Sequence, residues 1–157
     1  MPAKPRALVI GVGNAYRSDD AVGLIVAHRL RTLASNDVTV LEQSGEGTHL
    51  MEAWKDSETV ILLDAVFSGA KAGTIHRFDA RLQRVPRDFF RYSTHAFGVS
   101  DAIELARALD RLPPRLVVYG IEGKSFEVGT QLSLEVEKAT QELTELLLQE
   151  LSSAGRS

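Results

Sequence analysis

The sequence predicts an α/β fold, in which helices cover both faces of a largely parallel sheet to give a three-layer α/β/α sandwich. Short apolar runs without polar alternation are typical of strands that are buried on both faces. Such runs alternate along the chain with segments whose apolar residues recur three or four positions apart, as in helices that bury one face. The strands are expected at residues 7–12, 38–42, 59–66, 74–78 and 115–121, and the helices at 20–34, 48–55, 98–109 and 133–151.

The expected strand at residues 74–78 differs from the others because apolar and polar residues alternate along it. Alternation indicates one exposed face, so we place this strand at an edge of the sheet. The third expected helix is followed by Pro113-Pro114, which does not continue a helix. We find no internal repeat and no linker, and expect a single domain over residues 1–151 and a polar tail over residues 152–157.

Composition excludes several classes of function. With 157 residues, the chain is long enough to bury a core of its own. A formal net charge of −3 gives no basic surface, so we expect no nucleic-acid partner. The chain has no cysteine, so any metal would be held by Asp, Glu or His. No apolar run approaches roughly 18 residues, and we expect a cytoplasmic protein that does not insert into a membrane.

A glycine-rich loop joins the first expected strand to the first expected helix. Gly11 and Gly13 match the first two glycines of a dinucleotide-binding loop, but Tyr16 replaces the third. The adjacent carboxylates Asp19 and Asp20 would repel a phosphate there, by about 1 to 4 kcal/mol for each pair of charges. No Gly-Lys-Ser/Thr sequence follows, so we expect no nucleotide.

Three side chains are candidates for chemistry, and each also has a structural interpretation. Asp20 stands with Asp19 in the first turn of the expected helix, after Ser18 as N-cap, where capping explains acidic residues. Asp64 ends the most apolar strand, where a buried charge needs a cation, solvent or a hydrogen bond in a turn. His95 precedes the third expected helix, where surface histidines and neighbours of caps are common. The same structural interpretation is given to the remaining histidines, His28, His49 and His76.

The topology of such a sheet explains how the three candidates would meet. Ligands collect beyond the carboxyl ends of parallel strands, where neighbouring crossovers leave on opposite faces. If the first expected strand lies between the second and the third, Asp20 and Asp64 share this crevice, and the loop before the third helix brings His95 to it. Two carboxylates and an imidazole suit a divalent ion of borderline hardness and leave positions open for substrate or water. We therefore expect the three side chains to converge within coordinating distance of one ion.

The glycine-rich loop resembles the signature of the hydrogenase maturation endopeptidases, with Gly11-x-Gly13-Asn14, four further residues and Asp19-Asp20-x-x-Gly23. In that family an Asp follows at the end of the third strand and a His in a Ser/Thr-x-His segment. Asp64 and His95 stand at these positions. The resemblance continues through residues 118–122 and 132–136 and so covers nearly the whole chain.

The resemblance implies a mixed, mostly parallel five-stranded sheet with one antiparallel edge strand. It also implies an activity, since these endopeptidases remove the C-terminal extension of the large-subunit precursor of nickel–iron hydrogenase once nickel is inserted. The nickel then belongs to the substrate, and Asp20, Asp64 and His95 would contact it. Catalysis would rest on Asp20, Asp64 and Asn14, where Asn14 orients a carboxylate, donates to an oxyanion or stabilises the turn. We expect a monomer whose partner is the hydrogenase precursor.

One segment departs from the family pattern. After the second expected strand, many relatives carry an Asp-Gly-Gly-Thr-like loop, whereas this chain has Gln43-Ser-Gly-Glu-Gly-Thr48, which adds Glu46 near the expected cleft. Two mechanisms stay open from the residues alone: a carboxylate acts as base toward water, or the metal polarises the scissile carbonyl. Two other classes of function stay open as well, a nucleotide-binding module and a non-catalytic nickel-binding protein or hydrogenase-assembly chaperone.

Overall fold

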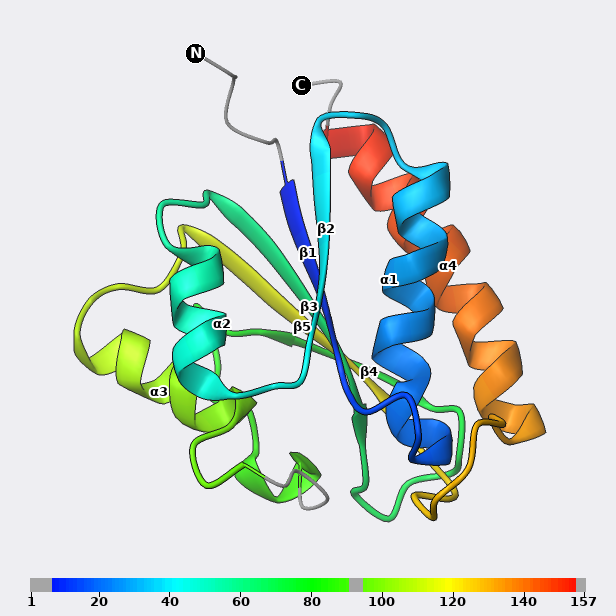
Figure 1. Cartoon of the computed structure of the whole chain (residues 1–157). Coiled ribbons are helices and arrows are strands. Elements are labelled where there is room, and N and C mark those ends of the chain that lie inside the picture. Colours follow the sequence, from blue (N-terminus) through cyan, green and yellow to red (C-terminus); the bar gives the residue numbers. More distant parts are fainter. Residues whose placement is uncertain (1–6, 91–94, 155–157) are drawn as a thin grey trace.

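The computed structural model describes residues 7–90 and 95–154, which form one sheet with helices on both sides (Figure 1). The strands are β1 (Ala7–Val12), β2 (Val38–Gln43), β3 (Thr59–Val66), β4 (Ile75–Asp79) and β5 (Arg115–Glu122). The helices are α1 (Val22–Leu33), α2 (Gly47–Trp54), α3 (Val99–Ala108) and α4 (Leu134–Ala154), with short 3₁₀ turns η1 (Ser18–Ala21) and η2 (Arg87–Phe90). Every helix and strand expected from the sequence is present within a few residues of its expected bounds.

The five strands lie in the order β2-β1-β3-β5-β4. All neighbouring pairs are parallel except β4 and β5, which are antiparallel. This arrangement confirms the mixed five-stranded sheet with an antiparallel edge strand. It also confirms that β1 lies between β2 and β3, which is the condition for a shared crevice at the carboxyl ends of β1 and β3.

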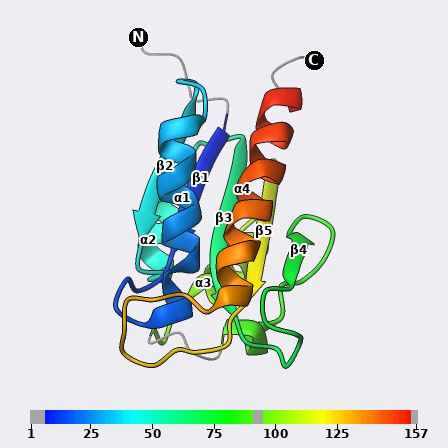
Figure 2. The same cartoon turned by 90° about the vertical axis from the view of Figure 1, so that its right-hand side faces the viewer.

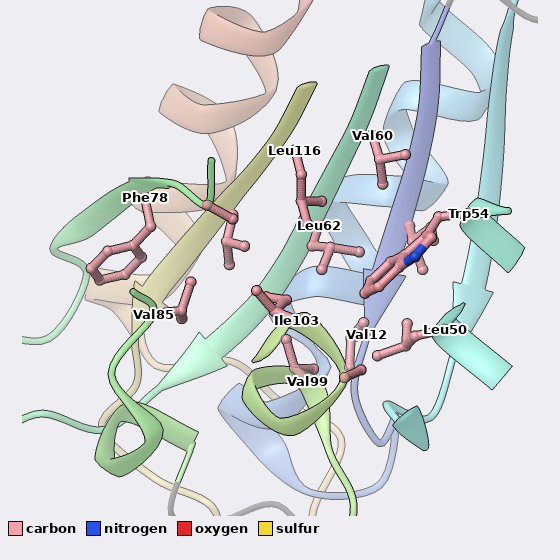
Figure 3. Packing of buried hydrophobic residues seen from close by; sticks show 14 of the residues in the cluster. Val12, Leu50, Trp54, Val60, Leu62, Phe78, Val85, Val99, Ile103 and Leu116 are labelled. Carbon is pink, nitrogen blue, oxygen red and sulfur yellow. The ribbon is translucent and has the colours of Figure 1, made fainter. Parts of the chain in front are cut away.

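Two helix pairs complete the three layers. Helices α1 and α4 cover one face of the sheet, and α2 and α3 cover the other (Figures 1 and 2). Each face has its own buried apolar cluster. Figure 3 shows the cluster under α2 and α3, where Trp54 and Ile103 pack near Leu62 of β3. Because β3 is buried on both faces, it is a rigid support for whatever side chain stands at its end.

Strand β2 is more exposed than its sequence predicts. The apolar run at residues 38–42 was expected to be buried on both faces, but the side chains of β2 are half-buried or exposed. The physical reason is its position, since an edge strand has a neighbour on one side only and the helices cover it incompletely. The strand expected at an edge, β4, does lie at the opposite edge.

The ends of two helices also differ from expectation. The helix expected to start at residue 20 is preceded by η1, and Ser18 is not its N-cap, because the Ser18 hydroxyl donates to the carbonyl oxygen of Glu127 at 2.7 Å. Helix α4 runs to Ala154 and so enters the segment expected to be a polar tail. In the described part of the chain, no helix is both long enough and apolar enough to cross a membrane.

Candidate active site at the carboxyl ends of β1 and β3

The loop after β1 brings the N-terminal turn of α1 against the sheet. A Cβ atom on Gly23 would lie 2.3 Å from the carbonyl oxygen of Leu63 and 2.7 Å from that of Val12. Only glycine therefore lets this turn touch the ends of β3 and β1. A Cβ atom on Gly13 would lie 2.0 Å from the carbonyl oxygen of Asp20. These close approaches place Asp20 beside the carboxyl end of β3.

Asp64 occupies that end of β3 and is only 7% exposed. One of its carboxylate oxygens accepts the backbone N–H of Ala65 at 2.8 Å. Burial raises the pKa of Asp64 well above its usual value, and the negative charge of Asp20 raises it further. The two carboxylates thus lie near enough to each other to interact through their charges.

Asp20 is held by the loop that precedes it. Its Oδ2 accepts the backbone N–H of Asn14 at 3.0 Å. Burial raises the pKa of Asp20, while the Asn14 hydrogen bond and the positive charge of Arg17 act in the opposite direction. The side-chain oxygen of Asn14 accepts the backbone N–H of Tyr16 at 2.9 Å. Asn14 therefore both stabilises the turn, through its side chain, and orients the carboxylate, through its backbone.

A cavity of about 540 Å³ opens at this edge of the sheet and gathers the candidates from the sequence. Asn14, Asp20, Asp64 and His95 all line it. The His95 ring contacts the loop after β2, where its Nε2 lies 3.2 Å from the carbonyl oxygen of Ser44. The structure thus joins side chains from three separate segments in one cavity, at the crevice that the topology predicts.

The cavity is not a closed metal cage. Within residues 7–90 and 95–154, no three carboxylate or imidazole side chains are gathered closely enough to hold an ion by themselves. Asp20, Asp64 and His95 share one cavity without forming such a group, and their contact with one ion stays a prediction. The three side chains come from different elements, since Asp20 stands in η1, Asp64 in β3 and His95 in the loop before α3.

The family model described as hydrogenase maturation protease matches residues 24–150 of the chain. The chain belongs to the hydrogenase maturation protease family. It is 29% identical over 154 residues to the hydrogenase 2 maturation protease of Escherichia coli K12, which covers 96% of this chain and 93% of the relative. It is also 25% identical over 160 residues to the hydrogenase expression/formation protein HupD of Thiocapsa roseopersicina, covering 99% of this chain and 72% of the relative.

Solved structures agree with this assignment. The solution structure of an endopeptidase from Escherichia coli superposes with a TM-score of 0.81 at 27% identity, covering 96% of this chain and 94% of that one. The [NiFe] hydrogenase maturation protease HycI of Thermococcus kodakarensis superposes with a TM-score of 0.73 at 25% identity and the same coverage, 96% and 94%. The α/β fold is thus the fold of the family, and the chain is a peptidase.

In this peptidase, the two adjacent aspartates of the signature do different things. Asp19 is fully buried and turns away from the cavity, where it accepts the backbone N–H groups of Lys124, Ser125 and Ser133 at 2.8 to 2.9 Å. It also accepts the hydroxyl of Ser133 at 3.0 Å. Asp19 is thus not among the residues that line the cavity, although it is adjacent to Asp20 in the sequence. Asp19 instead fixes the segment between β5 and α4, and Asp20 alone lines the cavity.

Glu46, in the segment that departs from the family pattern, has a structural partner. Its carboxylate accepts the backbone N–H groups of Thr48 and His49, and so it caps the N-terminus of α2. These hydrogen bonds lower the pKa of Glu46. Among the described residues, Ser44 and Gly45 are the members of this segment that line the cavity. Glu46 thus stabilises the N-terminus of helix α2.

Sequence reasoning missed the aromatic part of the cavity. Phe67, Phe89, Phe90 and Phe126 line it together with the carboxylates. A signal for it is present in the sequence, because Ala-Val-Phe67 directly follows Asp64 and Phe89-Phe90 stands in a short turn rather than in a strand or helix. Large apolar residues at the end of a strand, where a turn is expected to be polar, indicate a surface that something covers.

A buried pair behind the cavity was missed as well. His76 was expected to be a surface residue or the neighbour of a cap, but its Nε2 lies 3.1 Å from a carboxylate oxygen of Glu122, which is 1% exposed. Glu122 also accepts the backbone N–H of Ser68 at 2.8 Å. The partners are far apart in the sequence and meet because β4 pairs antiparallel with β5, so local spacing gave no sign of them.

Proposed function

We propose that the chain is an endopeptidase that removes the C-terminal extension of the large-subunit precursor of nickel–iron hydrogenase after nickel has been inserted. The proposal is supported by membership of the family and by relatives that are named for the maturation of hydrogenases. One structural observation connects this proposal to particular side chains. Asp20, Asp64 and His95 line a single cavity at the carboxyl ends of the parallel strands, where ligands bind in open α/β sheets.

The nickel of this proposal is part of the substrate. Asp20, Asp64 and His95 offer oxygen and nitrogen donors that suit a borderline divalent ion. They line one cavity but form no group that holds an ion by itself, so the rest of the coordination has to come from the group that brings the ion. A precursor that carries nickel thereby gains contacts that an empty precursor lacks, and each 1.4 kcal/mol so gained is about tenfold in affinity.

Within the carboxylate pair we assign different roles. Asp64 is buried and has the higher tendency to hold a proton, so it is suited to take a proton from water and pass it to the leaving amine. Burial raises the pKa of Asp20 as well, but the Asn14 N–H and the positive charge of Arg17 oppose this rise, so we assign to Asp20 the contact with a cation. Asn14 is a positioning residue in this scheme. No nucleotide takes part.

The test is to mix the purified protein with nickel-loaded precursor and to detect the released tail by mass spectrometry. We expect wild-type protein to release one defined tail and the Asp64→Asn variant to release none. Leu82→Ala, at a side chain that is 83% exposed and does not line the cavity, should cut like wild type. If wild-type protein binds the loaded precursor and never cuts it, the proposal is wrong and a hydrogenase-assembly chaperone explains the site.

A further inference from the structure

Four phenylalanines line the cavity, and we call them the aromatic wall: Phe67, Phe89, Phe90 and Phe126. They come from three places in the chain. Phe67 directly follows β3, Phe89 and Phe90 belong to η2, and Phe126 stands between β5 and α4. Asp20 and Asp64 line the same cavity, so the wall and the carboxylates border one continuous space.

The aromatic wall is held in place by contacts that do not depend on a ligand. The backbone N–H of Phe67 donates to the carbonyl oxygen of Phe89 at 2.8 Å. The rings of Phe67 and Phe126 meet edge to face, with centroids 5.9 Å apart. The ring of His76 packs against that of Phe89, with ring centroids 5.1 Å apart. The Nε2 of His76 in turn lies 3.1 Å from a carboxylate oxygen of Glu122. The wall is thus a preformed surface.

The rings of the wall keep apolar surface uncovered. Phe67, Phe89 and Phe126 line the cavity and are only half-buried. Phe89 and Phe126 pack against the buried apolar clusters, and Phe67 meets the ring of Phe126. Apolar surface in a concave site is covered favourably by an apolar group, because that removes both surfaces from water. A carboxylate would lose its hydration against the rings and find no hydrogen-bond donor on them.

We infer that the aromatic wall is the subsite for a large apolar side chain of the precursor next to the scissile bond. The inference rests on the proposed function, since the scissile bond is placed at Asp20 and Asp64. A peptide bond held at these carboxylates puts a neighbouring side chain into the remaining part of the cavity, which the wall borders. Phe67 and Phe126 are then the residues that determine which side chain is accepted there.

The test first maps the cleavage site of the loaded precursor with wild-type enzyme and then changes the two residues that flank it, one at a time, to Ala and to Asp. At one of the two positions, we expect replacement of an apolar residue by Ala to lower kcat/KM by ~10-fold or more, and replacement by Asp to lower it further. Equal rates for all these precursors would overturn the inference.

The second arm pairs these precursors with enzyme variants. Phe126→Ala should reduce processing of the original precursor by ~10-fold and processing of the Ala precursor far less, because the lost contact is one that the Ala precursor does not make. Phe126→Leu, which keeps an apolar side chain, should retain the preference for a large apolar residue. Leu82→Ala is the control and should match wild type on both precursors. A uniform loss on both precursors by Phe126→Ala would mean that the ring only supports the fold, and would overturn the inference.

Failure of the proposed function gives a different result. In that case the wild-type protein releases no tail from any precursor, and cleavage rates do not test whether the aromatic wall binds an apolar side chain. The subsite is then judged by calorimetric binding of peptides that span the junction of mature subunit and tail. Tighter binding of a peptide with a large apolar residue at one position than of its Ala counterpart, lost in Phe126→Ala, would uphold the subsite, and equal binding would reject it.

Discussion

Asp20 and Asp64 lie close enough in the cavity for the charge of Asp20 to raise the pKa of Asp64, in addition to the larger rise that burial causes. Two like charges brought together at a partly buried site lower the stability of the folded state. Such an arrangement is typical of groups that serve a reaction rather than the fold.

Asp64→Asn should therefore increase stability at neutral pH while it abolishes processing. An unfolded Asp ionises near its usual pKa of 3.8, whereas the folded pKa of Asp64 lies well above this. The folded state thus holds the proton more tightly, and the stability due to this group is fully present below about pH 3.8 and is lost as the pH rises toward the folded pKa. Each pKa unit corresponds to about 1.4 kcal/mol.

Thermal unfolding of both proteins between about pH 4 and pH 8 measures this effect. The variant should gain over wild type as the pH rises through this window and then keep a constant advantage. A difference in Tm that does not change with pH would show that Asp64 titrates normally in the folded protein.

Substitution by Asn should affect mainly stability at Asp19 and mainly activity at Asp20. Asp19→Asn turns an NH₂ group toward donors that Asp19 now satisfies, and should cost on the order of 3 kcal/mol of unfolding free energy. Asp20→Asn keeps an oxygen for the Asn14 N–H and should change stability by less than about 1 kcal/mol, yet stop processing. Urea denaturation and the tail-release assay separate the two, and a stable, fully active Asp20→Asn variant would remove Asp20 from the site.

Gly23→Ala should lose more stability than Gly69→Ala. Its Cβ would lie 2.3 Å from the Leu63 carbonyl oxygen, and backbone atoms do not move aside easily, so we expect a loss of about 3 kcal/mol or more. Gly69→Ala is the matched comparison, since its Cβ meets no atom within 4 Å and only its φ of 92° is unfavourable, at about 1 to 2 kcal/mol. Similar midpoints in urea for the two variants would contradict the close packing of α1 on β3.

His95→Ala should stop processing and leave the protein folded. The imidazole is half-buried and lines the cavity, and its Nε2 lies 3.2 Å from the carbonyl oxygen of Ser44, which is also a lining residue. We expect a change in unfolding free energy of about 1 kcal/mol or less. Circular dichroism and thermal unfolding check the fold, and a variant that cuts loaded precursor at the wild-type rate would exclude His95 from contact with the nickel.

The sequence predicts much of this site because the relevant signals are local. Apolar runs and helical spacing predict where the strands and helices lie. Because Asp64 follows an apolar stretch of its strand, it is expected near the carboxyl ends of the parallel strands. The order of β1, β2 and β3 then brings Asp20 to the same edge. A residue whose position follows from its own strand or loop is therefore predictable from one sequence.

The features that sequence reasoning missed depend on contacts between distant segments. Asp19 and Asp20 are adjacent, and only the fold decides that Asp19 faces Ser133 while Asp20 faces the cavity. The pairing of His76 with Glu122 depends on the register of β4 against β5. Periodicity carries no information about either contact, since neither is set by neighbours along the chain.

The most direct test concerns the source of the nickel. The enzyme is stripped with a chelator, the chelator is removed, and nickel-loaded and nickel-free precursors are offered separately, with tail release read by mass spectrometry. Because Asp20, Asp64 and His95 form no cage, the stripped enzyme should keep its full activity on the loaded precursor. It should release no tail from the nickel-free precursor. Activity that returns only after zinc or another ion is added back to the enzyme would contradict substrate-borne nickel and indicate an ordinary metalloprotease.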